Sequence, residues 1–457
     1  MAVSGMVQGT SLPRRTFIGF GMAAMASHAV QPLRAQSPNG KLNIGIIGAG
    51  GRGGANTNGV KGETIHTLCD VNPAALAGAK AKFPNAKTTS DWREVVANPD
   101  IDAVVISTAD HHHALASIAA MRAGKHVYCE KPLAHTVQEA RWMQEEYRKV
   151  KGKIATQMGT QIHATANYRK AVSAVRDGAA GEVDQVHVWC GRSIKPLGQS
   201  QPTQQEIPEG FNWDVWLGPA AERDYDQAYW KGGNLNWNRR WEFGNGVLGD
   251  MGSHLIDLAY WALDLDYPIA VKAEGSPASP IAAPPSQIVT WKHPEKEGVY
   301  GTPTAPATRK AVEVIWYHGP QGMKTMAERL QPLLGEKTDI SKWHIGLAFV
   351  GSKGVLVSDY GKIVRTNDSN WRKSTEIEPS AGHYAEWLKA CRGEGESLCN
   401  FDYSGKLIEH NLLGNAAHRA ALGKELTWDA KTVKITNHEA ANEYLGKTYR
   451  KGWGVDE

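Results

Sequence analysis

The stretch that decides the fold is Lys41-Leu42-Asn43-Ile44-Gly45-Ile46-Ile47-Gly48-Ala49-Gly50-Gly51-Arg52-Gly53-Gly54. Its first half is an apolar run typical of a buried strand, and its second half is a turn with the spacing G-x-G-x-x-G. In that pattern Gly48 permits the tight turn, Gly50 lets the backbone approach a pyrophosphate, and Gly53 lets the next helix pack against the strand. The pattern predicts a dinucleotide site with its phosphates at the helix N-terminus, and an ordinary glycine-rich turn is the alternative.

A second predicted strand, residues 64–68, leads to Asp70, which stands 22 residues after Gly48. The dinucleotide pattern places an acidic residue about 20 residues into the motif, where it accepts hydrogen bonds from the adenosine ribose. Its charge also repels the 2′-phosphate of NADP. Asp70 therefore favours NAD over NADP, whereas the nearby guanidinium of Arg52 reduces that preference.

Strand-like and helix-like segments alternate along residues 40–160, which predicts an α/β domain with a doubly wound parallel sheet. The further strands and helices predicted in this domain are strands 102–108 and 125–129 and helices 114–123 and 137–149.

Residues 108–113 follow a predicted strand at the edge of the sheet where cofactors bind. Thr108 and His113 are therefore candidate cofactor contacts. The run of three histidines at 111–113 suggests a metal ion at first sight. In an extended segment, however, neighbouring side chains point to opposite faces, and no cysteine or carboxylate stands at ligand spacing. We predict no metal site.

Two later motifs carry chemical groups, Glu130-Lys131-Pro132 after a strand and Asp250-Met251-Gly252-Ser253-His254 at the start of a predicted helix. On a helix, Asp250 and His254 lie one turn apart on one face. A carboxylate beside an imidazole raises its affinity for a proton and fixes its orientation, which suits a general base. The alternative is that Asp250 is the helix N-cap and His254 packs in the first turn. Alone, Glu-Lys-Pro is a strand end stopped by proline.

With the glycine motif, Asp70 and the 108–113 loop, these two motifs resemble the glucose–fructose oxidoreductase, inositol dehydrogenase and rhizopine-catabolism (Gfo/Idh/MocA) oxidoreductases. The likeness covers nearly all of residues 41–265. It implies that Glu130 lies at the cofactor and that Lys131 reaches the nicotinamide ribose and the substrate. It also implies that Asp250 and His254 supply the remaining catalytic groups, and that the protein is a dimer or tetramer.

Residues 161–457 are predicted to form an α+β domain with a large, mainly antiparallel sheet that binds substrate and mediates oligomerisation. The predicted elements are strands 182–189, 288–291, 312–317, 347–351 and 354–357 and helices 383–391 and 404–422.

Candidate substrate contacts lie at Tyr168, Arg169, Trp237 and Arg239. The last two belong to a tryptophan-rich segment, residues 191–248, whose aromatic faces and neighbouring polar groups suit a sugar ring. The alternatives are structural: Tyr168 and Arg169 cap or pack a helix, and most of the tryptophans hold a long loop in place.

The composition excludes several functional classes. The 457-residue chain has a net charge of +4 with both signs interspersed, which does not indicate binding to nucleic acid or to an anionic membrane. Its five scattered cysteines do not form a disulfide framework or a CxxC zinc site.

The N-terminus, residues 1–36, reads as a twin-arginine export signal and linker. Arg14-Arg15 precede a short, weakly apolar run, with a cleavage site near Ala35. A fortuitous arginine pair in a disordered tail is the alternative. The signal predicts a periplasmic protein that crosses the membrane folded and has no other membrane contact, because the run is shorter than the roughly 20 residues of a spanning helix.

The expected function is NAD-dependent oxidation or reduction of a hydroxyl in a sugar, cyclitol or related polyol. A periplasmic enzyme would carry its cofactor tightly bound and regenerate it within one catalytic cycle. The alternative is an NAD-dependent glycosidase acting through a transient 3-keto sugar, which the intact Glu-Lys-Pro disfavours because that branch of the family lacks the lysine. A non-catalytic sugar-binding relative is a third alternative, and the retained Lys131 and His254 disfavour it.

Overall fold

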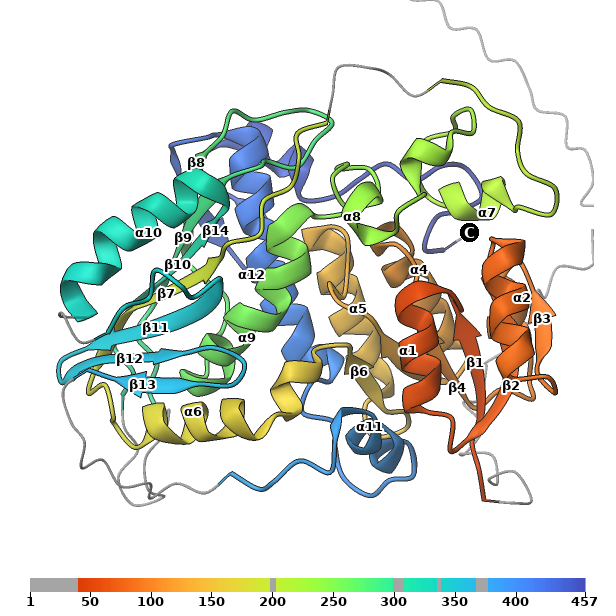
Figure 1. Cartoon of the computed structure of the whole chain (residues 1–457), viewed down its shortest axis with the longest axis horizontal. Coiled ribbons are helices and arrows are strands. Elements are labelled where there is room, and N and C mark those ends of the chain that lie inside the picture. The colour runs from red at the N-terminus through yellow and green to blue at the C-terminus, as the bar shows by residue number, and fades with distance from the viewer. Residues whose placement is uncertain (1–39, 198–202, 299–307, 335–337, 367–376, 457) are drawn as a thin grey trace, which may run out of the picture. The chain divides into compact units, whose positions relative to one another are not determined.

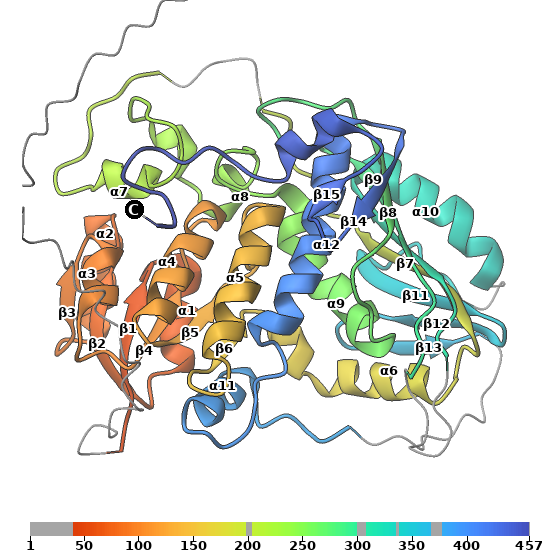
Figure 2. The same ribbon diagram turned by 180° about the vertical axis from the view of Figure 1, so that it is seen from behind.

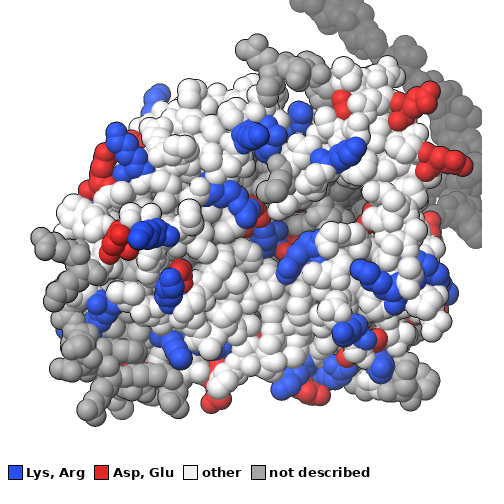
Figure 3. All heavy atoms as spheres, in the orientation of Figure 1, with Lys and Arg blue, Asp and Glu red and all other residues white. Residues whose placement is uncertain are grey.

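The computed structural model describes residues 40–197, 203–298, 308–334, 338–366 and 377–456. Two β-sheets organise this part of the chain (Figure 1). The predicted export signal lies outside the described residues. Within them, no helix combines the length and the apolar character needed to cross a membrane. The face drawn in Figure 3 shows acidic and basic side chains interspersed, as the small net charge predicts.

The first sheet has six parallel strands in the order β3-β2-β1-β4-β5-β6. The chain leaves β1 to build one side of the sheet and returns beside β1 to build the other, so the topological switch point lies between β1 and β4. The elements are β1 (Asn43–Ile47), α1 (Gly51–Gly59), β2 (Thr64–Cys69), α2 (Pro73–Lys82), β3 (Lys87–Thr89), α3 (Trp92–Ala97), β4 (Ala103–Ile106), α4 (Asp110–Arg122), β5 (His126–Cys129), α5 (Val137–Val150) and β6 (Thr156–Met158). This sheet confirms the predicted α/β domain.

Helix α4 begins four residues earlier than predicted, so the three histidines lie in its first turns and not in an extended segment. Their ring nitrogens form hydrogen bonds with backbone carbonyl oxygens of other segments. His111 Nε2 and His112 Nε2 lie 3.0 and 2.9 Å from the carbonyl oxygen of Trp216. The histidines are buried and their rings are bonded to the backbone, which gives the run a structural role.

The second sheet has nine strands in the order β13-β12-β11-β7-β10-β9-β8-β14-β15, antiparallel except for β7 beside β10. This arrangement confirms the predicted α+β domain. Its strands are β7 (Val183–Cys190), β8 (Ala270–Gly275), β9 (Gln287–His293), β10 (Val312–His318), β11 (Ile345–Gly351), β12 (Gly354–Ser358), β13 (Ile363–Arg365), β14 (Glu425–Asp429) and β15 (Lys434–Ile435).

Helices cover both faces of the second sheet. Alternate residues of β7 and β10 point to opposite faces, so Trp189 and Tyr317 pack under α10 (Gly319–Leu334) while Val188 and Trp316 join the main core. That main core includes α6 (Ala166–Arg176), α9 (Ser253–Ala262) and α12 (Phe401–Ala420). Helix α12 packs against both α5 and β8 and so links the two sheets (Figure 2).

A late segment of the chain completes the core of the first sheet. Helix α11 (His383–Cys391) places Trp387 and Cys391 against Ile44, Ile46 and Tyr128 of the parallel sheet. Tyr128 also lies 3.1 Å from His383 through its hydroxyl. The division between residues 40–160 and 161–457 is therefore crossed by this returning helix.

Candidate active site

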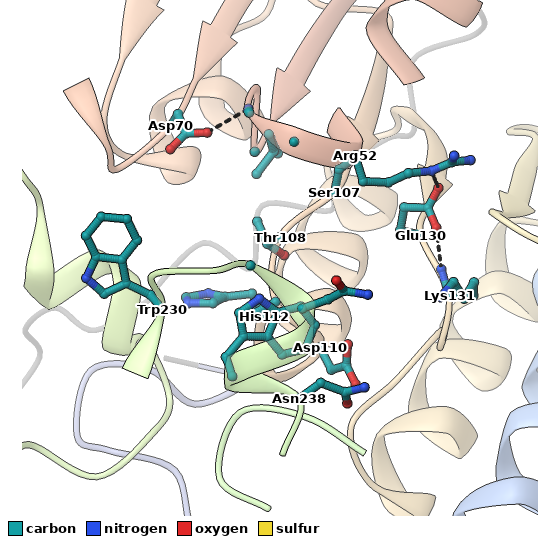
Figure 4. Close-up of a pocket in the computed structure, with 18 of the residues that line it drawn as sticks. Arg52, Asp70, Ser107, Thr108, Asp110, His112, Glu130, Lys131, Trp230 and Asn238 are labelled. Atoms are coloured by element: carbon teal, nitrogen blue, oxygen red, sulfur yellow. Dashed lines mark hydrogen bonds and ion pairs between the residues drawn. The ribbon is translucent and has the colours of Figure 1, made fainter. Parts of the chain in front are cut away.

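A cavity of about 790 Å³, here called the main cavity, opens at the carboxyl ends of β1, β2, β4 and β5. Its other walls come from the turn before α9 and from the tryptophan-rich segment that contains α7 (Trp213–Leu217) and α8 (Asn234–Trp237) (Figure 4). Its size and its mixture of aromatic and polar walls are typical of a ligand site.

The glycine turn forms one end of the main cavity and has the shape that a dinucleotide needs. Gly48 has a positive φ of 82°, and a Cβ on Gly53 would lie 1.7 Å from the carbonyl oxygen of Gly48. Helix α1 begins at Gly51 with no side-chain cap and no acidic residue in its first turn. Its first N–H groups are therefore left for an anion, which is the role predicted for this turn.

Asp70 lies beside the glycine turn and forms a hydrogen bond with it. Its Oδ2 accepts the Gly50 N–H at 2.9 Å (Figure 4). Its Oδ1 accepts the Asn72 N–H at 2.9 Å. Burial raises the pKa of Asp70, although these backbone donors oppose the shift. A carboxylate has about four acceptor positions, so Asp70 keeps capacity for ribose hydroxyls. The residues at this end fit an adenine dinucleotide.

Glu130 gathers the polar groups in the middle of the main cavity. Its Oε1 accepts hydrogen bonds from Arg52 Nε at 2.9 Å and from Asn56 Nδ2 and Gln161 Nε2 at 3.0 Å each. Burial would raise the pKa of Glu130, but the charges of Arg52 and Lys131 outweigh it and lower the pKa. Figure 4 shows Arg52 turned toward Glu130, not toward Asp70.

Thr108 lines the main cavity, as predicted, whereas His113 does not. His113 is buried behind the wall, with Nδ1 2.7 Å from the carbonyl oxygen of Pro132 and Nε2 3.1 Å from that of Thr108. Both ring nitrogens face backbone carbonyls of the wall, so the structure corrects the prediction of a direct cofactor contact. His113 ties together the segments after β4 and β5.

Lys131 and Asp250 meet across the main cavity. The Lys131 ammonium group forms an ion pair with the Asp250 carboxylate and donates to the Asp250 carbonyl oxygen at 3.1 Å. The other carboxylate oxygen pairs with Arg192, which follows β7 and was not predicted as a site residue. Burial would raise the pKa of Asp250, but the charge of Lys131, with help from Arg192, lowers it.

His254 lies beside this pair but does not take the role predicted for it. Leu248–Gly252 forms a π-helical turn before α9. Within this turn the Asp250 carboxylate forms ion pairs with Lys131 and Arg192 and not with the imidazole of His254. Burial, followed by the charge of Lys131, lowers the pKa of His254 to about 3, against the opposing effect of Asp250. The predicted increase in proton affinity is therefore wrong. The imidazole is neutral, and its Nδ1 has no hydrogen-bond partner among the described residues.

The predicted substrate contacts divide into two groups. Trp237 lines the main cavity, but Tyr168, Arg169 and Arg239 do not. The Tyr168 hydroxyl donates to the His254 carbonyl oxygen at 2.9 Å, one layer behind the wall. Arg169 pairs with Glu386 at 2.8 Å, and Arg239 donates to the Pro196 carbonyl oxygen at 2.7 Å. The structure thus corrects these three predictions in favour of the structural alternatives.

Aromatic side chains of the tryptophan-rich segment build a core of their own, the structural role given above as the alternative. Trp213 stacks on Trp216 with ring centroids 4.8 Å apart, over the fully buried Phe243. Trp216, Trp230 and Trp237 reach the main cavity.

The main cavity also contains polar side chains that the sequence did not reveal. Asp110 comes from the start of α4, Asn238 follows α8, and Tyr360 lies between β12 and β13. The Tyr360 hydroxyl is buried and has no hydrogen-bond partner among the described residues. Within the same residues, no three histidine, cysteine, aspartate or glutamate side chains are grouped to hold a metal ion.

Two family models match this chain, one over the first sheet and one over part of the second. Residues 42–158 match the model of the Gfo/Idh/MocA oxidoreductase family for its NAD-binding Rossmann fold, and residues 183–298 match its C-terminal alpha/beta domain. Together the two matches cover just over half of the chain.

Among curated relatives, levoglucosan dehydrogenase of Pseudarthrobacter phenanthrenivorans is 35% identical over 241 residues, which are 48% of this chain and 50% of that protein. A glycosyl hydrolase family 109 protein of Solibacter usitatus is 40% identical over 116 residues, 22% of this chain and 26% of that protein. The chain thus matches half or less of the length of these relatives.

Among solved structures, the WlbA dehydrogenase of Bordetella pertussis in complex with NADH and UDP-GlcNAcA superposes with a TM-score of 0.58 at 18% identity. The superposition covers 85% of this chain and 99% of that one, and it supports the fold. The two family matches, which together cover just over half of the chain, lead to one conclusion: the chain belongs to the Gfo/Idh/MocA family of NAD-binding oxidoreductases.

Proposed function

We propose that this protein uses NAD to oxidise a secondary hydroxyl, or reduce the corresponding ketone, of a sugar or related polyol. The observation that carries the proposal is the meeting of Lys131, Asp250 and His254 in the cavity whose other end is the glycine turn. The similarity to a levoglucosan dehydrogenase, an enzyme named for a sugar-derived substrate, supports the choice of substrate class.

When bound, NAD supplies the acceptor for the hydride that leaves the carbinol carbon. The protein must remove the hydroxyl proton as that hydride leaves. His254 lines the main cavity and its imidazole is neutral, so a ring nitrogen is available to accept that proton. The Lys131 ammonium group stabilises the negative charge that develops on the substrate oxygen.

Asp250 positions Lys131, with which it forms an ion pair, and not His254. Its carboxylate holds the ammonium group from one side while Arg192 occupies the other oxygen, so Lys131 is kept at the cavity wall. The orientation of His254 instead depends on α9, whose first turn is fastened by Tyr168 through the His254 carbonyl oxygen. Tyr168 and Asp250 are positioning residues in this mechanism.

We also propose that NAD is preferred over NADP. Asp70 lies at the glycine turn, where the carboxylate would face a 2′-phosphate. Arg52, the one residue whose charge argued for NADP, is engaged by Glu130 at 2.9 Å.

The experiment that tests the proposal measures reduction of NAD by the purified protein with a panel of sugars and cyclitols. The expected result is NADH formation with at least one of them, lost in Lys131→Ala and His254→Ala variants that still bind NAD. If both variants kept wild-type turnover on that substrate, the assignment would be wrong.

The similarity to a glycosyl hydrolase family 109 protein favours one second candidate, cleavage of a glycoside through a transient 3-keto sugar. The retained Lys131 speaks against it. Incubation with a nitrophenyl glycoside separates the two functions: release of nitrophenol without net NADH would support the glycosidase, and stoichiometric NADH without nitrophenol would support the dehydrogenase.

Periplasmic export and tight cofactor binding are further parts of the proposal. They rest on the paired arginines Arg14-Arg15 and the short apolar run that follows them. An exported enzyme retains its cofactor, so nucleotide released by denaturing the gel-filtered protein should equal the protein in amount. A nucleotide-free protein would contradict tight binding, and a cytoplasmic location of the tagged full chain would contradict export.

A further inference from the structure

A second cavity of about 520 Å³ lies on the far side of the tryptophan-rich segment and shares no lining residue with the main cavity. Its walls come from the start of α5, the segment after α8, helix α12 and residues 443–448. A cavity of this volume holds a ligand of about monosaccharide size or larger.

Two arginines in this second cavity lack a charged partner. Arg240 and Arg419 form no ion pair with any described carboxylate, and the Nε of each is buried without a hydrogen bond. The Arg419 guanidinium instead lies between two rings, 5.2 Å from the centroid of Trp241 and 4.7 Å from that of Tyr444. Arg240 lies 4.9 Å from the centroid of Tyr229.

The remaining cations of the second cavity are already engaged. Arg223 pairs with Glu242, and Lys447 pairs with Glu139 at 2.7 Å. The lining carboxylates are Glu242 and Glu443, and Glu443 is exposed. The wall therefore carries an excess of positive charge at Arg240 and Arg419.

Burial lowers the pKa of both arginines. At Arg240 the neighbouring cations Arg223 and Arg239 lower it further, against the attraction of Tyr229 and Glu242. A position in the last turn of α12 favours a cation through the helix dipole, which accounts for a basic residue at Arg419. The dipole does not account for Arg240, or for the aromatic rings beside both guanidinium groups. A guanidinium can bind an oxyanion through two N–H groups at once.

We propose that this second cavity binds a small organic oxyanion, a carboxylate or a phosphate ester of about monosaccharide size, through Arg240 and Arg419. The site is separate from the redox chemistry of the main cavity, so it does not depend on the proposed dehydrogenase function.

The test is isothermal titration calorimetry of the full chain saturated with NAD, so that the pyrophosphate site is filled. The probes are D-glucuronate and glucose 6-phosphate, with glucose as the neutral control. Saturable binding of either anion with one site per chain is expected, and the anion that binds identifies the carboxylate or the phosphate ester as the ligand group. Absence of saturable binding of both anions would overturn the proposal.

Variants then locate the binding. Arg419→Gln and Arg240→Gln should each weaken binding at least tenfold, because each removes a charge-assisted contact. Arg148→Gln is the matched control, since Arg148 lies near the other end of α5, paired with Asp402. Equal weakening by the control would show a general charge effect and refute the site.

A chemical measurement covers the case in which a variant fails to fold. Phenylglyoxal modifies accessible arginines, and peptide mass analysis reports the modified fraction of Arg419 in the wild-type protein. A saturating anion should protect Arg419 and leave Arg148 unprotected. Modification of Arg419 at the same rate with and without the anion would contradict the proposal.

Discussion

The main cavity and the second cavity hold their positive charges in different ways. In the main cavity, Arg52 is matched by Glu130, and Lys131 and Arg192 are matched by Asp250. In the second cavity, Arg240 and Arg419 lie beside aromatic rings and form no ion pair with a described carboxylate. Paired charges form a fixed frame around a reaction, whereas unpaired charges form a receptor that a ligand completes. The main cavity therefore has the charge arrangement of a preorganised reaction site, and the second cavity has that of a binding site.

The largest effect is expected from Lys131→Ala, which removes the ion pair with Asp250 from the main cavity. Turnover should fall roughly 10²- to 10⁴-fold because the substrate oxygen loses its cationic partner. Thermal stability should change little, since Asp250 keeps Arg192. Steady-state NADH formation measures the loss, and replacement of an exposed lysine of α5, Lys149→Ala, is the control. Wild-type turnover in the variant would remove Lys131 from the mechanism.

The neutral imidazole of His254 predicts an acid-sensitive fold. Its folded pKa of about 3 lies below the ordinary value of 6.5, so the unfolded chain binds the proton first as the pH falls. Stability from this group is complete above pH 6.5 and is lost as the pH falls toward the folded pKa. At pH 5 the loss is about 2 kcal/mol.

Urea unfolding at pH 7 and pH 5 tests this expectation by comparing wild type with His254→Gln. The variant should lose about 2 kcal/mol less on acidification, because glutamine does not titrate. An identical pH response in both proteins would show that His254 is not held neutral.

A smaller effect is expected at the glycine turn from Asp70→Asn. Removing the charge should raise the ratio of kcat/KM for NADP to that for NAD about tenfold, through lost repulsion of the 2′-phosphate and a weaker ribose contact. Asp100→Asn, an exposed aspartate at the opposite end of the sheet, is the control. An unchanged ratio would mean that Asp70 only shapes the turn.

The smallest effect is expected from Arg240→Gln without ligand. Because Arg240 forms no ion pair with a described carboxylate and its charge is disfavoured by burial, the free energy of unfolding should change by at most about 0.5 kcal/mol. In the main cavity, Asp250→Asn leaves two cations with a weaker partner and should cost about 1–3 kcal/mol. Urea denaturation measures the free energy of unfolding of both variants. An equal loss of stability in the two would contradict the distinction between paired and unpaired charges in the two cavities.

The sequence predicts those parts of the site that depend on local geometry. The glycine turn, Asp70 and the residues after β4 and β5 lie in the main cavity because a parallel sheet brings its carboxyl ends together. A local amphipathic pattern likewise predicts α11 at its observed bounds, His383–Cys391.

The errors arise where distant segments meet. Arg192 follows a strand of the second sheet and reaches Asp250 only in the folded chain, so no local pattern marks it. The pKa of His254 depends on burial and on Lys131, which lies 123 positions earlier in the sequence. Helix α10 escaped prediction because Gly319-Pro320 and Pro332 signal turns, although its apolar face covers the second sheet.

Helix α11 has a consequence for the order in which the molecule assembles. The parallel sheet is built from residues 43–158, yet Trp387 and Cys391 belong to its core. During synthesis, part of the apolar face of this sheet therefore lacks its cover until residue 391 has been made. A dinucleotide meets its finished binding domain only when nearly the whole polypeptide exists, so cofactor capture is coupled to completion of the chain.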